Sequence, residues 1–171
     1  PKRPEVQGRK AFASLSEVGE PVELAVIATP PQTVPDIIEE CGKHGVKAAV
    51  IITAGFSETG AKGPALEKAV LDNAKLYGIR LIGPNCLGVM MPGVSLNASF
   101  SAHMPAPGNL ALISQSGAIA AGMVDWAAQR AVGFSGIVSI GDQLDVDIAD
   151  LLDYFAMDGK TRAILLYVEA I

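Results

Sequence analysis

The chain has 171 residues, of which 50% are hydrophobic, enough to form the core of one ordinary domain or of two small ones. Its 13 basic and 18 acidic residues give a formal net charge of -5 without a basic run, which argues against nucleic acid as the main partner. No apolar run approaches the roughly 18 residues of a membrane helix and no signal peptide is visible, so we expect no membrane partner.

The first half of the chain alternates short apolar runs with amphipathic segments. Leu24 to Thr29 and Ala48 to Thr53 are continuous apolar runs, typical of strands buried on both faces of a parallel sheet. Between them, Thr33 is a candidate helix cap and Gly45 a helix terminator. The predicted order is a strand at 24–29, a helix at 33–45, a strand at 48–53, a Gly-rich loop at 54–63, a helix at 64–78 and a strand at 80–82.

The pattern lapses between residues 89 and 109, where prolines and glycines are frequent. We therefore expect a connection between two domains, which divides the chain into 1–88, 89–109 and 110–171. After the connection the alternation restarts. The predicted order is a strand at 110–114, a helix at 118–130, a strand at 137–140, a helix at 147–157 and a strand at 163–168.

This alternation of strands and helices predicts an α/β fold with right-handed crossovers and parallel sheets. Ligands bind such sheets beyond the carboxyl ends of the strands. We therefore expect function in the loops that follow the predicted strands, after residues 29, 53, 82, 114, 140 and 168.

The segment 114–118 (SQSGA) follows one predicted strand and opens a helix. A helix N-terminus presents unpaired N–H groups and about half a positive charge, so this turn can receive a phosphoryl or carboxylate group. The alternative is a serine cap on a tight turn between strand and helix. From the residues alone, the cap is slightly favoured.

The remaining chemically notable residues have mostly structural interpretations. Cys41 and Cys86 form no CxxC pattern, favour a reducing, cytoplasmic setting and are expected to be buried thiols. Asp142, Asp145 and Asp147 surround a predicted helix start, where acidic groups favour the helix dipole. Their spacing matches no calcium loop, so metal binding is the weaker alternative and no metal site is predicted.

Glu169 follows the last apolar strand. A lone carboxylate is costly to bury without a partner. Glu169 is therefore either exposed at the edge of the sheet or held there to orient a catalytic group.

Four motifs, in order, resemble the succinyl-CoA synthetase α-subunit superfamily. They are residues 82–88 (IGPNCLG), 113–117 (ISQSG), 141–147 (GDQLDVD) and 167–169 (YVE). Within it, the chain looks most like NDP-forming acetyl-CoA synthetases. Residues 96–101 and 152–167 resemble the branch that is fused to a GNAT domain, which includes bacterial protein lysine acetyltransferases of the Pat type.

The resemblance implies a Rossmann-like CoA-binding unit without its first strand and Gly-rich loop, followed by a flavodoxin-like ligase unit that is truncated at its C-terminus. It places CoA at the strand-end loops, and it places the phosphoryl group of a phosphohistidine at the turn that opens the helix. A glutamate matched by Glu169 orients that histidine. The implied CoA-binding residues are Lys2, Thr29, Pro30, Thr53, Ala54, Gly55, Asn85 and Cys86, and the implied phosphate-binding residues are Ser114, Ser116, Gly117 and Ala118.

The implied function is the α-like portion of an NDP-forming acyl-CoA ligase that uses CoA and an acid such as acetate. ATP or ADP and Mg would be held by other parts of the parent, with an ATP-grasp domain and a GNAT domain as candidate partners. Neither His44 nor His103 matches the phosphohistidine, so we expect this fragment alone to be inactive. The alternative is a non-catalytic CoA- or acyl-CoA-binding regulatory region of a GNAT-type lysine acetyltransferase.

Overall fold

The computed structural model describes residues 3–57, 60 and 63–169. It opens with a short antiparallel pair, β1 (Glu5–Val6) and β2 (Arg9–Lys10), followed by a 3₁₀ turn at Leu15–Glu17. The backbone N–H of Leu15 donates to Glu40 Oε1 at 2.7 Å, which attaches this segment to the first α/β unit. Among the described residues, no helix combines the length and the apolar character needed to cross a bilayer.

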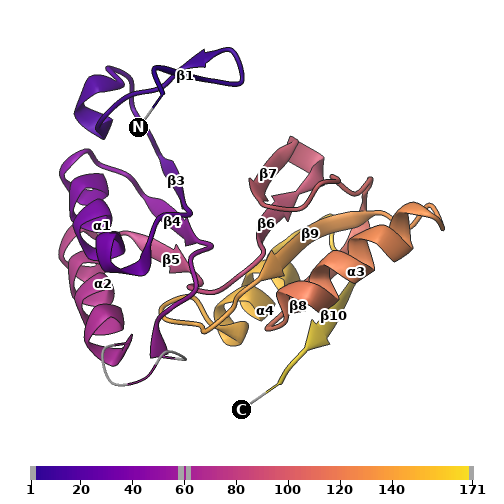
Figure 1. Cartoon of the computed structure of the whole chain (residues 1–171). Coiled ribbons are helices and arrows are strands. Elements are labelled where there is room, and N and C mark those ends of the chain that lie inside the picture. The colour runs from indigo at the N-terminus through magenta and orange to yellow at the C-terminus, as the bar shows by residue number, and fades with distance from the viewer. Residues whose placement is uncertain (1–2, 58–59, 61–62, 170–171) are drawn as a thin grey trace.

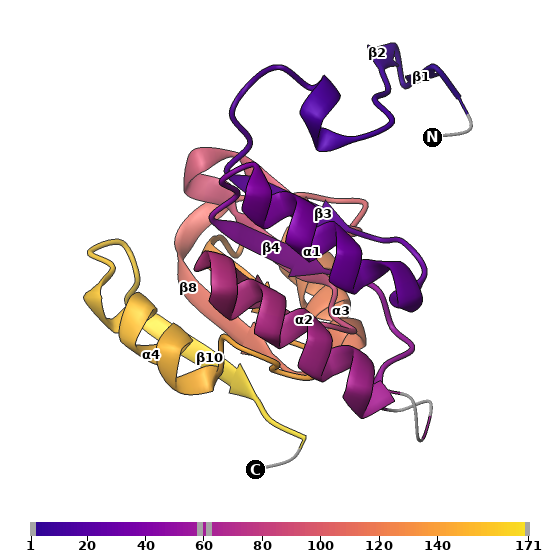
Figure 2. The same cartoon turned by 90° about the vertical axis from the view of Figure 1, so that its left-hand side faces the viewer.

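The first α/β unit is a three-stranded parallel sheet covered on one face by two helices (Figures 1 and 2). Its strands are β3 (Leu24–Ile27), β4 (Ala48–Ile51) and β5 (Arg80–Ile82), in that order. Helices α1 (Val34–Lys43) and α2 (Gly63–Tyr77) pack side by side. They come very close at Gly42, where an added Cβ would lie 2.1 Å from Tyr77 Cγ.

The second unit is a five-stranded mixed sheet in the order β10-β8-β9-β6-β7. Strands β8 (Pro107–Ser114), β9 (Phe134–Ser139) and β10 (Ala163–Tyr167) are parallel, whereas β6 (Gly88–Met91) runs antiparallel to both β9 and β7 (Leu96–Ser99). Helix α3 (Gly117–Ala128) packs on the face that carries Leu112 and Ile137, and α4 (Ile148–Met157) on the face that carries Ala111 and Val138. The prediction of two α/β units is confirmed.

Most of the expected connection at 89–109 has regular structure. Residues 88–99 form the antiparallel pair β6 and β7, joined by a 3₁₀ turn at Pro92–Val94 and a left-handed Ser95. The Pro-Gly dipeptide therefore marks a tight turn and not a linker. Because β6 runs antiparallel to its neighbours, the second sheet is not purely parallel. The domain boundary at residue 88 stays a prediction.

Strand β8 also starts earlier than the pattern predicted, at Pro107. Gly108 and Gly133 bring the starts of β8 and β9 together, because a Cβ on Gly108 would lie 2.2 Å from the carbonyl carbon of Gly133. Only glycine allows the two backbones to come this close, although a glycine in a sequence usually indicates a loop.

The two sheets share an apolar core. Val50 of β4, Cys86 and Ala98 of β7 are buried together, with Leu24, Ile52, Ile82, Val89 and Leu96 packed around them. An apolar cavity of about 250 Å³ lies in the same region between the units. The face of the first sheet that α1 and α2 leave open is thus partly covered by the second unit.

Candidate functional site

The loops after β3 and β4 are joined by side-chain hydroxyl groups. Thr53 Oγ1 donates to the carbonyl oxygen of Thr29 at 2.7 Å. Thr33 Oγ1 lies 2.9 Å from Thr29 Oγ1 and 2.7 Å from the carbonyl oxygen of Pro30. Gly55 has a φ of +105°, and a Cβ there would lie 2.9 Å from Pro31 Cγ. Four predicted CoA-binding residues, Thr29, Pro30, Thr53 and Gly55, therefore form one edge.

The turn after β5 packs on this edge. Asn85 has a left-handed backbone with φ of +57°, and its N–H donates to the carbonyl oxygen of Thr53 at 2.9 Å. Gly83 has a φ of +97°, and any Cβ there would lie 2.4 Å from the carbonyl oxygen of Ile51. Both conformations hold the turn against the end of β4.

Cys86 is a buried thiol and not a candidate nucleophile. Its Sγ donates to the carbonyl oxygen of Ile51 at 3.3 Å, and its side chain belongs to the core between the units. Burial raises the pKa of Cys86 from the ordinary 9.0 to about 12, with a smaller contribution from the charge of Asp142. Burial also raises the pKa of Cys41 in α1. Both thiols are therefore protonated near neutral pH.

The turn that opens α3 has the expected helix N-terminus. Ser116 is the cap, and its Oγ accepts from the N–H of Ile119 at 3.4 Å. The first backbone hydrogen bond of the helix runs from Ala120 N to Ser116 O at 3.1 Å, so the N–H groups of Gly117 and Ala118 precede it. Buried Ser114 uses its hydroxyl within the turn, donating to Ser116 O at 2.8 Å and accepting from Ser116 N at 3.1 Å.

Gln115 connects this turn to the end of β10. Its N–H donates to the carbonyl oxygen of Tyr167 at 3.1 Å, and its Oε1 accepts from the N–H of Glu169 at 2.5 Å. The side chain of Glu169 is exposed beside the turn. Sequence reasoning gave Gln115 no role, because its partner lies 54 residues away.

A cavity of about 680 Å³ lies between the first-unit loops and α3. Five of the predicted site residues are among those that line it: Ala54, Asn85, Cys86, Gly117 and Ala118. The lining residues that the sequence did not suggest are Ile52, Leu87, Phe100 and Ala121. Phe100 is 64% exposed, and its N–H donates to the carbonyl oxygen of Leu87 at 3.2 Å. Lys2 lies outside the described residues.

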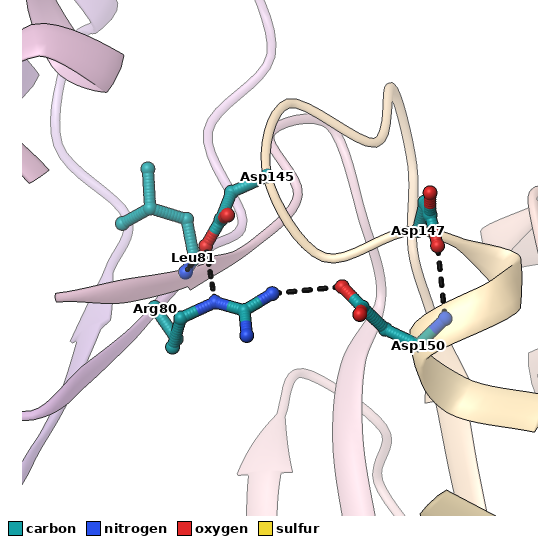
Figure 3. A network of polar contacts seen from close by, with 5 residues as sticks. All are labelled: Arg80, Leu81, Asp145, Asp147 and Asp150. Atoms are coloured by element: carbon teal, nitrogen blue, oxygen red, sulfur yellow. Dashed lines mark hydrogen bonds and ion pairs between the residues drawn. The ribbon is translucent and has the colours of Figure 1, made fainter. Parts of the chain in front are cut away.

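The three aspartates of the 141–147 motif have separate structural partners, of which Figure 3 shows those of Asp145 and Asp147. Asp147 caps α4, with its Oδ1 accepting from Asp150 N at 2.9 Å. Asp145 pairs with Arg80 of β5, and Asp142 Oδ1 lies 3.3 Å from Asn85 Nδ2. Among the described residues there is no group of three or more His, Cys, Asp or Glu side chains that could hold a metal ion.

Two known families match this chain. Residues 1–92 match the CoA binding domain, and residues 107–171 match the succinyl-CoA ligase like flavodoxin domain. The chain belongs to the CoA-binding domain family. The loops of its CoA-binding domain that converge on the 680 Å³ cavity lie within the matched residues.

Individual relatives of this chain are acetate–CoA ligases. It is 47% identical over 171 residues to an ADP-forming acetate–CoA ligase of Methanocaldococcus jannaschii, covering 100% of this chain and 24% of that protein. It is 43% identical over 169 residues to the α subunit of an ADP-forming acetate–CoA ligase of Pyrococcus furiosus, covering 98% and 37%. The chain thus spans about a quarter to two fifths of the length of these relatives.

A solved structure has the same fold. Acetyl-coenzyme A synthetase 1 of Ca. Korarchaeum cryptofilum, in complex with phosphate and ADP, superimposes with a TM-score of 0.92 at 40% identity. The match covers 99% of this chain and 36% of that one.

Proposed function

We propose that this chain is the α-like portion of an ADP-forming acyl-CoA ligase that acts on a small carboxylic acid such as acetate. The observation that carries this proposal is the 680 Å³ cavity, whose wall includes both the Asn85–Cys86 turn and the first residues of α3. The thiol end of CoA would lie at the turn, and a phosphoryl group would lie at the N–H groups of Gly117 and Ala118.

Each part of the chemistry has a physical basis in these residues. A helix N-terminus stabilises the negative charge of a phosphoryl group as it moves from a phosphohistidine to the acid. The resulting acyl phosphate would react with the CoA thiolate, which forms the thioester C–S bond while the C–O bond to phosphate breaks and phosphate leaves. The apolar walls would exclude water, which would otherwise hydrolyse the acyl phosphate.

The histidine would come from outside this chain. His44 is on α1, with its Nδ1 2.9 Å from the carbonyl oxygen of Glu40, and neither His44 nor His103 is among the residues that line the cavity. Exposed Glu169, attached through Gln115 to the α3 turn, would orient the incoming histidine. Ser114 would shape the turn, and Ser116 would cap it beside the phosphoryl group.

The nucleotide would bind elsewhere in the parent, in an ATP-grasp domain of the same protein or of a partner chain. We assign Mg to those parts as well, because Mg is usually held together with the phosphates of the nucleotide. We place the reaction in the cytoplasm, where reducing conditions keep Cys41 and Cys86 as free thiols.

A second candidate is a CoA- or acyl-CoA-binding regulatory region fused to a GNAT lysine acetyltransferase. Its support is the resemblance of residues 96–101 and 152–167 to that branch. The parent sequence beyond Ile171 discriminates the two: a histidine after the next βα unit favours the ligase. A GNAT domain without that histidine favours the regulator.

The experiment for the ligase uses the full-length protein that carries this chain. We expect ADP to form over many turnovers only when acid, CoA and ATP are all present, because phosphorylation of the histidine alone releases a single ADP per enzyme. Changing Ser116→Asp places a carboxylate where phosphate would bind, so we expect turnover to fall at least about a hundredfold, in the range seen when charge stabilisation is lost. The control Ser116→Asn keeps a capping oxygen without the charge and should retain most activity. Unchanged turnover in Ser116→Asp would refute the phosphoryl role.

A further inference from the structure

A loop of the second unit runs along the edge of the first. Three alternating N–H groups, of Asp142, Leu144 and Val146, donate to the carbonyl oxygens of residues 84, 83 and 81 at 3.0, 3.1 and 3.1 Å. The loop therefore follows β5 and its turn in the manner of an extra strand. Gly141 permits this approach, because its φ is +55° and an added Cβ would lie 2.0 Å from the carbonyl oxygen of Pro84.

Side chains secure the same contact (Figure 3). Asp145 Oδ2 accepts from the Arg80 guanidinium Nε at 2.9 Å and from the N–H of Leu81 at 2.8 Å. Arg80 Nη2 also lies 2.7 Å from Asp150 Oδ2, at the start of α4. One arginine of the first unit is thus held by two aspartates of the second, and one of them also binds the backbone of β5.

The loop also reaches the turn that opens α3. The N–H of Ile140 donates to the carbonyl oxygen of Ser114 at 2.9 Å, and buried Ser139 Oγ accepts from the N–H of Leu87 at 3.0 Å. A hydrogen-bonded path consequently runs from Ser114 through residues 139–146 to the turn at 83–87. One end of the path, at residues 85–87, lines the 680 Å³ cavity, and the other end, Ser114, opens the turn whose residues Gly117 and Ala118 line it.

We propose that residues 141–146 are a positioning clamp that sets the distance between the CoA turn and the phosphoryl turn, with Asp145 and Arg80 as positioning residues. This inference rests on the proposed ligase function. Thioester formation requires the thiol and the acyl phosphate to lie within about 3–3.5 Å, so a small displacement of one turn costs rate. Phosphorylation of the enzyme by ATP would take place where the nucleotide binds, outside this chain, and would not depend on the clamp.

The test compares two reactions of the full-length protein. Asp145→Ala removes the acceptor for both Arg80 and the N–H of Leu81. We expect kcat for thioester formation at saturating CoA to fall by about tenfold to a hundredfold. We expect the rate of enzyme phosphorylation by radiolabelled ATP to stay within about twofold, because the nucleotide binds outside the part of the protein that the clamp holds together. Asp145→Asn retains an oxygen that can accept from the N–H of Leu81, so its kcat for thioester formation should fall less than that of Asp145→Ala.

The matched control is Asp72→Ala, which breaks the exposed Lys68–Asp72 pair of α2, remote from the clamp. It should leave both rates unchanged. A double-mutant cycle with Arg80→Ala should show that the effects of Arg80 and Asp145 on kcat are not additive.

Each outcome has a distinct meaning. Wild-type protein without acid- and CoA-dependent ADP formation refutes the ligase function itself. Active wild type with an unaltered Asp145→Ala refutes the clamp, and so does an equal loss of both reactions, which indicates general destabilisation. If Asp145→Ala does not fold, the same comparison is made with Asp145→Asn, in which a selective loss of thioester formation supports the clamp and its absence refutes it.

Discussion

At the scale of single residues, Cys86 lies at the candidate site but lacks the properties of a reactive thiol. The side chain lies in the wall of the cavity, yet its thiol donates to a backbone carbonyl and is buried. Burial disfavours the thiolate, the form that attacks electrophiles or binds metal. Cys86 therefore contributes packing and shape to the site and does not compete with the CoA thiol.

This gives a prediction for the pH dependence of Cys86 labelling. With a pKa of about 12 in the folded protein, against 9.0 ordinarily, Cys86 should react slowly with iodoacetamide at pH 7 to 9. In guanidinium chloride the same thiol should react many times faster. Mass spectrometry of the peptide that contains Cys86 measures both rates. Rapid labelling of the folded protein at pH 7 would show that the thiol is accessible and ionised.

The same shift predicts how stability depends on pH. The folded pKa of Cys86 is raised, so its stabilising contribution is complete below pH 9, where the thiol is protonated in both states. The contribution is then lost as the pH rises from about 9 to about 12, because the unfolded state releases the proton first. Replacement by serine, which does not titrate there, should flatten this part of the stability curve.

At the scale of elements, helix α4 begins at the capping residue Asp147. Asp147 Oδ1 accepts from the N–H of Asp150, and Asp150 in turn contacts Arg80. The start of α4 therefore fixes one end of the clamp. The sequence predicts Asp147 at the start of a helix, but it does not predict that Arg80 pairs with Asp145 and Asp150.

We predict that Asp147→Ala lowers the free energy of unfolding by about 1 kcal/mol, the usual cost of removing a capping side chain. Asp147→Asn keeps an acceptor of similar geometry and should cost far less. Urea denaturation followed by circular dichroism compares the two variants. Equal losses in both would indicate that the charge, and not the cap, stabilises the helix.

At the scale of the whole molecule, the two units share one apolar interface. α1 and α2 cover one face of the first sheet, and the opposite face contributes Val50 to the cluster with Cys86 and Ala98. Apolar burial of this kind is non-directional and couples the stability of the surfaces that it joins. The units should therefore lose stability together.

Two valines, one buried and one exposed, test whether the two units lose stability together. Val50 is 2% exposed and Val26 is 47% exposed. Val50→Ala should destabilise the protein by about 2 kcal/mol through lost burial and a cavity, whereas Val26→Ala should have little effect. Hydrogen exchange of peptides covering β4 and β9 should accelerate together in Val50→Ala. Acceleration confined to β4 would mean that the units unfold independently.

The order of buried strands and amphipathic helices could be predicted because each depends on local periodicity and on the residues that begin and end it. The antiparallel pair β6–β7 could not, since Pro92 and Gly93 in its turn are equally typical of a linker. Five of the residues that line the cavity could be predicted, because ligands bind at the carboxyl ends of parallel strands. Phe100 and Ala121 carry no such signal, and only the path of the chain places them there.

The sequence by itself thus determined the alternating elements, the strand-end loops and the helix N-terminus at Ser116. Those features follow from backbone geometry and apolar spacing over a few residues. Only the tertiary structure decided that Asp145 binds Arg80 across 65 residues and that Gln115 holds the backbone of Glu169 across 54. Such pairings depend on how the two sheets pack against each other, and residue types at distant positions do not specify that packing.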